Sequence, residues 1–154
     1  MDDEERTTSF GLIRFASDFR KAAQATDKAL SKEVANDWLA PIPALYLMGH
    51  STELGFKAYL RHKGRDLNTL RRIGHNLETA YSKCKAAGIL EICEFSKDEL
   101  KAMGVLNDLY RTKMLNYIKT GSCRFPNWGT LESLNRELIK NVSLSIGYPG
   151  APLA

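Results

Sequence analysis

From Pro43 to Leu60 the chain reads PALYLMGHSTELGFKAYL, a stretch that is apolar on nearly every side of a helix. Such a helix belongs in a domain interior, because a surface helix keeps a polar face. Its polar groups form one column with spacings of three and four residues: His50, Glu53, Lys57 and Arg61. A buried carboxylate must be paired or hydrogen-bonded. We therefore expect Glu53 to be neutralised by Lys57 within the helix or by donors on other helices.

The composition is that of an ordinary globular protein, with 154 residues, 44% hydrophobic and 26% charged. We predict one domain over residues 1–146 and a Gly- and Pro-rich tail over residues 147–154. The opening residues are acidic, unlike a secretory leader. The longest apolar run, residues 39–49, contains two prolines and is about half the length of a bilayer span. We expect a cytoplasmic protein without a membrane segment.

Three cysteines, Cys84, Cys93 and Cys123, are odd in number and show no close paired spacing. A disulfide framework or a zinc site would need paired or clustered thiols. We expect reduced structural thiols, with neither a metal nor a cofactor.

Apolar periodicity predicts an all-α bundle of about five helices. The expected helices run from a cap near Thr8 to about Leu30, over residues 43–60, over residues 77–87, from Ser96 to about Gly121, and over residues 131–142. Their expected caps are Asn76, Ser96 with Glu99 as a capping box, and Thr130. Residues 89–95 suit either a short helical turn or an extended connection.

The segment after the first buried helix, RHKGRDLNTLRR over residues 61–72, is strongly basic. Its first three cations would close a helix, where they complement the helix dipole whatever the function. Arg71 and Arg72 have no such explanation, and this density of cations is typical of a phosphate-binding surface. Ordinary surface arginines are the alternative.

The helix after Ser96 carries a second polar intrusion into an apolar face. Arg111 lies beside the core stripe, and Asn107 lies one turn earlier. An arginine on such a face needs an acid or a ligand anion. We expect Arg111 to lie close to Glu53 and Lys57. These three side chains and Asn107 are therefore candidates for a binding site. If Arg111 simply pairs with Glu53, the cluster is a buried ion pair without chemistry.

Three separated elements resemble the HEPN superfamily of helical nucleotide-binding domains: GHSTELGFKAYL, GHNLETAY and LNDLYRTKMLNYIKTG. The resemblance spans roughly residues 41–121. The family's E-L-x-x-K pattern is matched by Glu53, Leu54 and Lys57, and its H-D-L pattern by His75, Asn76 and Leu77. Asn76 stands where aspartate is usual, but both residues cap helices well. The resemblance implies a helical bundle.

Nuclease members of that superfamily carry an R-x4-6-H motif, in which the arginine binds phosphate and the histidine helps the ribose 2′-hydroxyl to attack. Here Arg111 is followed five residues later by Asn116, which cannot exchange a proton near neutral pH. The chain is therefore similar to the non-catalytic members. These dimerise, bind nucleotide, RNA or protein partners, and often act beside a nucleotidyltransferase.

Two other functions remain open from the sequence. One is a divergent, toxin-like ribonuclease in which Arg111, Asn116 and Tyr117 hold the substrate while His75 or His50 transfers the proton. The other is a structural adaptor that binds no ligand.

The resemblance also implies a homodimer. Tyr110, Tyr117, Phe125 and Trp128 supply aromatic groups around the end of the fourth predicted helix. Alternatively, Phe125 and Trp128 hold their loop against their own bundle.

Overall fold

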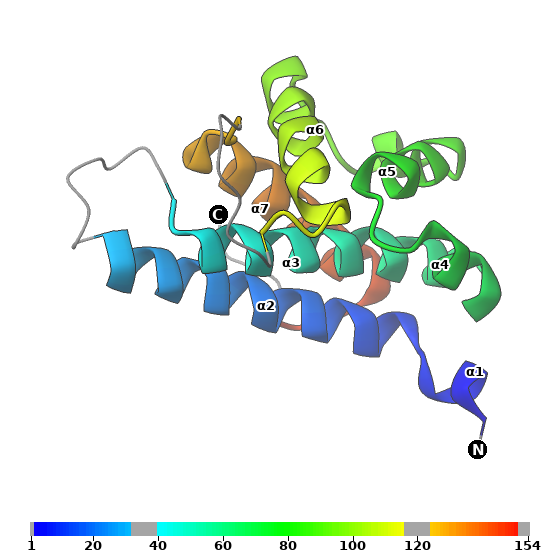
Figure 1. Ribbon diagram of the computed structural model, residues 1–154. Helices are drawn as coiled ribbons and strands as arrows, with labels where there is room; N and C mark the ends of the chain where they lie inside the picture. The colour runs from blue at the N-terminus through cyan, green and yellow to red at the C-terminus, as the bar shows by residue number, and fades with distance from the viewer. Residues whose placement is uncertain (1, 32–39, 116–123, 151–154) are drawn as a thin grey trace.

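The computed structural model describes residues 2–31, 40–115 and 124–150, and in these ranges all regular structure is helical (Figure 1). The elements are α1 (Asp3–Arg6), α2 (Ser9–Leu30), α3 (Ile42–His62), α4 (Leu67–Ile73), α5 (Leu77–Ala86), the 3-10 turn η2 (Ile89–Glu91), α6 (Lys97–Arg111) and α7 (Trp128–Ile146). The all-α prediction is confirmed. No helix in the described ranges is long and apolar enough to cross a membrane.

The long helices α2 and α3 lie side by side in Figure 1 and run antiparallel, because the start of α2 meets the end of α3. Thr8 caps α2 by accepting the Gly11 amide at 2.9 Å. Pro43 lies in the first turn of α3, where its missing N–H costs nothing. Helix α3 is buried along most of its length, as its apolar sequence predicted.

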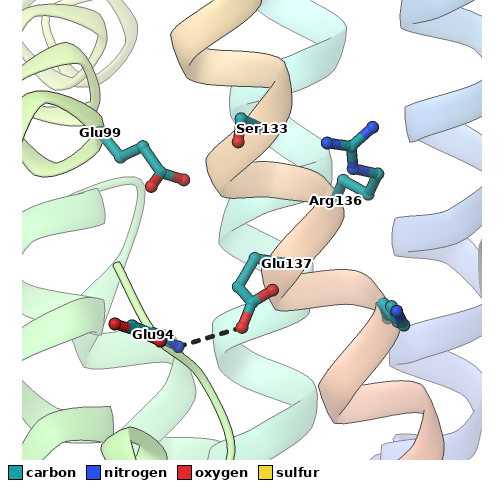
Figure 2. Close-up of a pocket in the computed structure, with 6 residues that line it drawn as sticks. Glu94, Glu99, Ser133, Arg136 and Glu137 are labelled. Carbon is teal, nitrogen blue, oxygen red and sulfur yellow. Dashed lines mark hydrogen bonds between the residues drawn. The ribbon is translucent and has the colours of Figure 1, made fainter. Parts of the chain in front are cut away.

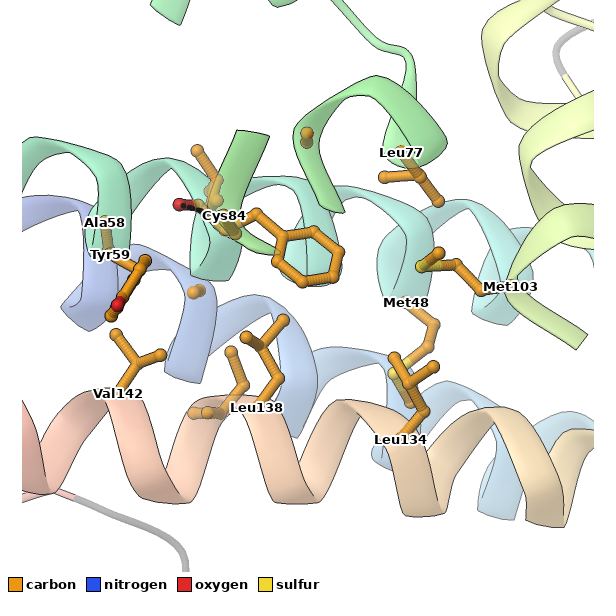
Figure 3. Packing of buried hydrophobic residues seen from close by; sticks show 14 of the residues in the cluster. Met48, Ala58, Tyr59, Leu77, Cys84, Met103, Leu134, Leu138 and Val142 are labelled. Carbon is orange, nitrogen blue, oxygen red and sulfur yellow. Dashed lines mark hydrogen bonds between the residues drawn. The ribbon is translucent and has the colours of Figure 1, made fainter. Parts of the chain in front are cut away.

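Helices α5, α6 and α7 cover the remaining faces of α3 and close one hydrophobic core. Figure 3 shows Met48, Ala58 and Tyr59 of α3 among side chains from the other helices: Leu77, Cys84, Met103, Leu134, Leu138 and Val142. Gly55 lets α7 approach closely, because a Cβ there would lie 2.8 Å from Ile139 Cδ1. Helix α3 is therefore the central element, and its few polar groups must find partners inside the protein.

Helix α6 ends at Arg111, so the prediction that it continues to about Gly121 is wrong over residues 112–115. Lys113 has a φ of 58°, and its amide bonds the Tyr110 carbonyl while the Met114 amide bonds that of Leu109. This pair of bonds is a Schellman ending, which usually requires glycine. The apolar periodicity of the sequence continues past this helix end, and a lysine at position 113 is not a residue type that predicts one.

Two other features differ from the predicted helices, and one open alternative is decided. The last helix starts three residues earlier than expected, because Asn127 rather than Thr130 is its cap. The short helices α1 and α4 were not predicted, since seven residues or fewer give almost no periodic signal. Residues 89–91 form the helical alternative.

Candidate functional site

The carboxylate of Glu53 lies in the middle of α3 and is 3% exposed. Its Oε1 accepts a bond from Lys57 Nζ at 2.7 Å. Its Oε2 accepts from the Tyr110 hydroxyl at 2.6 Å and from His75 Nδ1 at 2.9 Å. His50 Nδ1 lies 3.8 Å from the same Oε2. These five residues, His50, Glu53, Lys57, His75 and Tyr110, are called the Glu53 cluster below.

Each partner reaches Glu53 through a specific local structure. Tyr110 comes from the last turn of α6, and its ring lies against Gly49, where a Cβ would be 2.7 Å from the ring carbon Cδ1. His75 lies in the turn between α4 and α5, where Gly74 has a φ of 60°. Lys57 Nζ also donates to the Gly74 carbonyl at 2.8 Å. Lys57 therefore ties the carboxylate and the turn that carries His75 together.

Asn107 supports the same turn from α6. Its Oδ1 accepts the Leu77 amide at 2.7 Å, and its Nδ2 donates to Asn76 Oδ1 at 3.1 Å. Asn76 in turn caps α5 by accepting the Thr79 amide. Asn107 is buried and has no free polar edge for a ligand. Asn107, predicted as a binding residue, contacts the turn that carries His75 and not Glu53 itself, so its contacts are those of a positioning residue.

The pKa of Glu53 is held well below its usual range. Burial by itself raises that pKa, but the surrounding groups together outweigh burial: His50, His75, Lys57 and Tyr110. The pKa of Tyr110 is raised by burial and by the neighbouring negative charge of Glu53. At neutral pH the carboxylate is therefore ionised and accepts bonds only, while the tyrosine keeps its proton.

These protonation states assign the tautomers of both histidines. An ionised Glu53 requires His75 Nδ1 to carry the donated proton. The Tyr110 hydroxyl donates its hydrogen bond to Glu53, so its oxygen accepts a bond from His50 Nδ1 at 3.1 Å. In both rings the Nε2 atom is left outside these bonds. The His75 side chain is 59% exposed and that of His50 is 28% exposed, so two oriented imidazoles meet solvent beside one buried carboxylate.

Arg111 does not belong to the Glu53 cluster, and the predicted grouping of Glu53, Lys57 and Arg111 is wrong. Arg111 is exposed and forms no ion pair with any residue in the described ranges. The neighbouring Tyr110 takes its place, because one residue turns a side chain by about 100° around a helix. Asn116 and Tyr117 of the alternative catalytic set lie outside the described residues.

The basic segment meets an acidic partner at the N-terminus. Arg61, the last member of the polar column, pairs through Nη1 with Glu4 at 2.7 Å. Arg71 lies 3.2 Å from Asp3 in an exposed pair. Arg72 bonds the Thr69 hydroxyl one turn away on α4. The sequence signal was therefore correct about a dense set of cations, but it missed that two of them are already paired.

A second polar group on another face of α3 was also missed. Arg20 Nη2 pairs with Glu132 at 2.6 Å, and its Nη1 donates to Asn135 Oδ1 at 2.9 Å. The Asn135 amide then donates to the Ser51 and Thr52 hydroxyls at 3.0 Å each. We call Arg20, Ser51, Thr52, Glu132 and Asn135 the Arg20 network. Every member finds a partner inside the protein, so this network joins α2, α3 and α7 without offering a site.

A surface hollow of about 300 Å³ lies beside α7 and is lined by Glu94, Glu99, Ser133, Arg136, Glu137 and Lys140. Figure 2 shows the first five of these side chains. Glu137 accepts the Glu94 amide at 3.0 Å, and Glu99 completes the capping box of α6 with Ser96. Two of its three glutamates are thus occupied: Glu99 holds the start of α6, and Glu137 holds the connection that precedes α6. Among the described residues no group of His, Cys, Asp or Glu side chains is arranged to hold a metal.

The aromatic residues and the cysteines singled out in the sequence differ in how far they are exposed. Tyr110 is buried, Trp128 is partly buried against the core, and Phe125 is 36% exposed. Cys84 and Cys93 are free and buried, and Cys123 lies outside the described residues. Burial raises the pKa of the Cys93 thiol to about 12, which makes it inert.

Comparisons of the chain with family models, with curated proteins and with solved structures found no match.

Proposed function

We propose that this protein is a HEPN-like, non-catalytic binding module that recognises the phosphates of RNA or of a nucleotide. One observation carries the proposal. His75 is oriented through Nδ1 by the buried Glu53 carboxylate, and His50 is oriented through Nδ1 by the Tyr110 hydroxyl that donates to the same carboxylate. The Nε2 atom of each ring takes no part in these bonds. A structural pair would need only Lys57 to neutralise Glu53, so the presence of one exposed and one half-buried imidazole at the same carboxylate calls for another explanation.

The surroundings of the two histidines suit nucleic acid. Helix α4 ends at Ile73, two residues before His75, so Arg71 and Arg72 precede the cluster directly. Cations at this position can neutralise phosphates. Phe19 meets His50 edge to face with ring centres 4.5 Å apart, and Tyr46 is 39% exposed. Exposed aromatic rings provide surfaces on which bases stack.

A second function, a divergent toxin-like ribonuclease, is favoured by the same Nε2 atoms. An imidazole whose Nδ1–H is held by a carboxylate can act as a general base through Nε2, as in hydrolytic triads, and His75 has this arrangement with Glu53. The exposed position of Arg111 and the asparagine at position 116 count against the motif of the nuclease members. We therefore place the binding module first.

The proposal includes a homodimer and a nucleotidyltransferase as partner protein, both implied by the family resemblance. Among the aromatic groups first considered for the dimer, Phe125 is the exposed one in the described ranges. Sedimentation at tens of micromolar should show a dimer. A monomer at that concentration would remove dimerisation from the proposal.

RNA binding is the direct test of the proposed function. Fluorescence anisotropy with a labelled single-stranded RNA should give an affinity that falls steeply with salt. The double variants Arg71→Ala/Arg72→Ala and His50→Gln/His75→Gln should each weaken binding by about tenfold or more. Lys97→Ala/Lys101→Ala, which removes two exposed charges at the start of α6, serves as the matched control. Equal losses in all three variants would indicate unspecific charge attraction and contradict the proposal.

The same RNA, incubated with the purified chain for hours, separates binder from enzyme. The binding module should leave it intact. Metal-independent cleavage that His75→Gln abolishes would promote the ribonuclease instead. Absence of both binding and cleavage would favour the structural adaptor.

A further inference from the structure

The acidic N-terminal segment lies over the basic segment that follows α3. Residues 2–6 read DDEER, four acids and one cation, whereas residues 61–72 hold five arginines and lysines and one acid. The two stretches are more than fifty residues apart in sequence, yet Glu4 and Asp3 meet Arg61 and Arg71. Their charges are opposite and nearly balanced.

Arg61 is the centre of this contact. Its Nη2 donates to the Glu4 carbonyl at 2.8 Å and its Nε to the Thr7 carbonyl at 2.8 Å, in addition to the ion pair with the Glu4 carboxylate. The Glu4 carboxylate also accepts the Leu67 amide, at 3.0 Å through Oε1 and 3.1 Å through Oε2. A carboxylate held by a guanidinium and a backbone amide occupies the position that a phosphate group would prefer.

The segment is held by charge and hydrogen bonds rather than by packing. Helix α1 contains no buried residue. The next helix, α2, has its own cap in Thr8, so the core does not depend on α1. The Asp3–Arg71 pair is exposed, and the Glu4 side chain is 42% exposed although Arg61 is half-buried. Ion pairs that reach solvent in this way weaken with salt, and another anion can replace the carboxylate.

From these observations we propose that residues 2–6 are an intramolecular competitor, an acidic cover that a phosphate polyanion must displace to reach Arg61 and Arg71. The cover then lowers the affinity of the resting protein for RNA. This inference rests on the proposed function, since it concerns regulation of the same basic surface. The ligand chemistry is a chain of phosphates, which RNA and inorganic polyphosphate share.

The test compares two double variants of the full chain with the same change in charge. Asp3→Asn/Glu4→Gln weakens the cover, while Glu94→Gln/Asp98→Asn removes two exposed acids near the start of α6. In anisotropy titrations with labelled single-stranded RNA, the cover variant should bind about tenfold more tightly than wild type, and the control should change less than about threefold. Equal changes in the two variants would overturn the inference. Inorganic polyphosphate as competitor should displace RNA from both.

A second measurement does not depend on substitutions. Trypsin cleaves after Arg6, and Arg61 holds the next carbonyl, that of Thr7, in the covered state. RNA should therefore accelerate cleavage at Arg6, followed by mass spectrometry, if it displaces the cover. Protection of Arg6 by RNA would overturn the inference.

The two proposals fail in different ways. If Arg71→Ala/Arg72→Ala weakens RNA binding but the cover variant behaves like its control, the inference fails and the proposed function stands. If wild type binds no RNA and the cover variant does, the inference is supported. If neither binds, both fail.

Discussion

Two polar clusters flank α3, and they differ in how they meet water. The Arg20 network lies towards α2 and α7, and its arginine, asparagine and hydroxyls find all their partners inside the protein. The Glu53 cluster lies towards the α4–α5 turn and α6, and it leaves two imidazole edges at the surface. Both contain a buried charge. The comparison indicates that burial of a charge marks a structural need, whereas a ring nitrogen left without a partner in the cluster marks a candidate site.

The largest effect is expected when Glu53 is replaced, and this variant tests whether the Glu53 cluster also stabilises the fold. Replacing Glu53 with alanine removes the acceptor of Lys57, His75 and Tyr110 at once. The free energy of unfolding should fall by about 3 kcal/mol, because a cation and a buried hydroxyl lose their partner. Urea unfolding measures this, with the exposed Asp18→Ala as control, expected to change stability by less than about 0.5 kcal/mol. A loss no larger than the control's would mean that solvent replaces the carboxylate.

Loss of the arginine from the Arg20 network should lower the free energy of unfolding somewhat less than Glu53→Ala does. Arg20→Met keeps the length of the side chain but removes the donor to Asn135 Oδ1 and the cation that pairs with Glu132. We expect a loss of about 2 kcal/mol, since Glu132 is 21% exposed and can reach water. Adding Glu132→Leu should restore part of the loss, because removing both partners avoids a stranded charge. No recovery in the double variant would indicate that the network contributes more than this pair.

A further difference should appear at acidic pH, where the stability contribution of Glu53 is lost. Because the pKa of Glu53 is lowered on folding, its contribution is fully present above the unfolded value of 4.5. As pH falls below 4.5 toward the folded-state pKa, Glu53 becomes protonated in the unfolded chain but stays ionised in the native state. The free energy of unfolding therefore declines by up to about 1.4 kcal/mol per pH unit. Glu53→Gln should lose this part of the decline, which parallel denaturant titrations from pH 6 to pH 3 can measure. Identical slopes in both proteins would contradict the lowered pKa.

The smallest effect is expected at the open edge of the Glu53 cluster. His75→Gln should change stability by about 0.5 kcal/mol, because the side chain is 59% exposed and the amide can still donate to Glu53. Thermal melts would show it. Near-wild-type stability combined with weaker RNA binding would separate the role of this histidine in recognition from its role in the fold. A loss as large as that of Glu53→Ala would make His75 a structural residue.

The sequence by itself determined most of the helical framework. The caps at Thr8, Asn76 and Ser96 and the pair of Glu53 with Lys57 are contacts over three or four residues. Such contacts depend only on helical geometry and on side-chain chemistry. The buried character of α3 was equally readable from its apolar composition. The HEPN resemblance, in contrast, stays a prediction.

Tertiary structure decided which partners reach Glu53. Tyr110 lies 57 residues away in sequence, and its contact depends on how α6 is rotated against Gly49 of α3. A rotation of one residue would have presented Arg111, as the sequence-based argument expected. The Arg20 network and the contacts of α1 with the basic segment could not be predicted from the sequence for the same reason. Ion pairs between distant segments depend on how the helices dock. Docking is set by the packing of the whole core, and no local pattern in the chain records it.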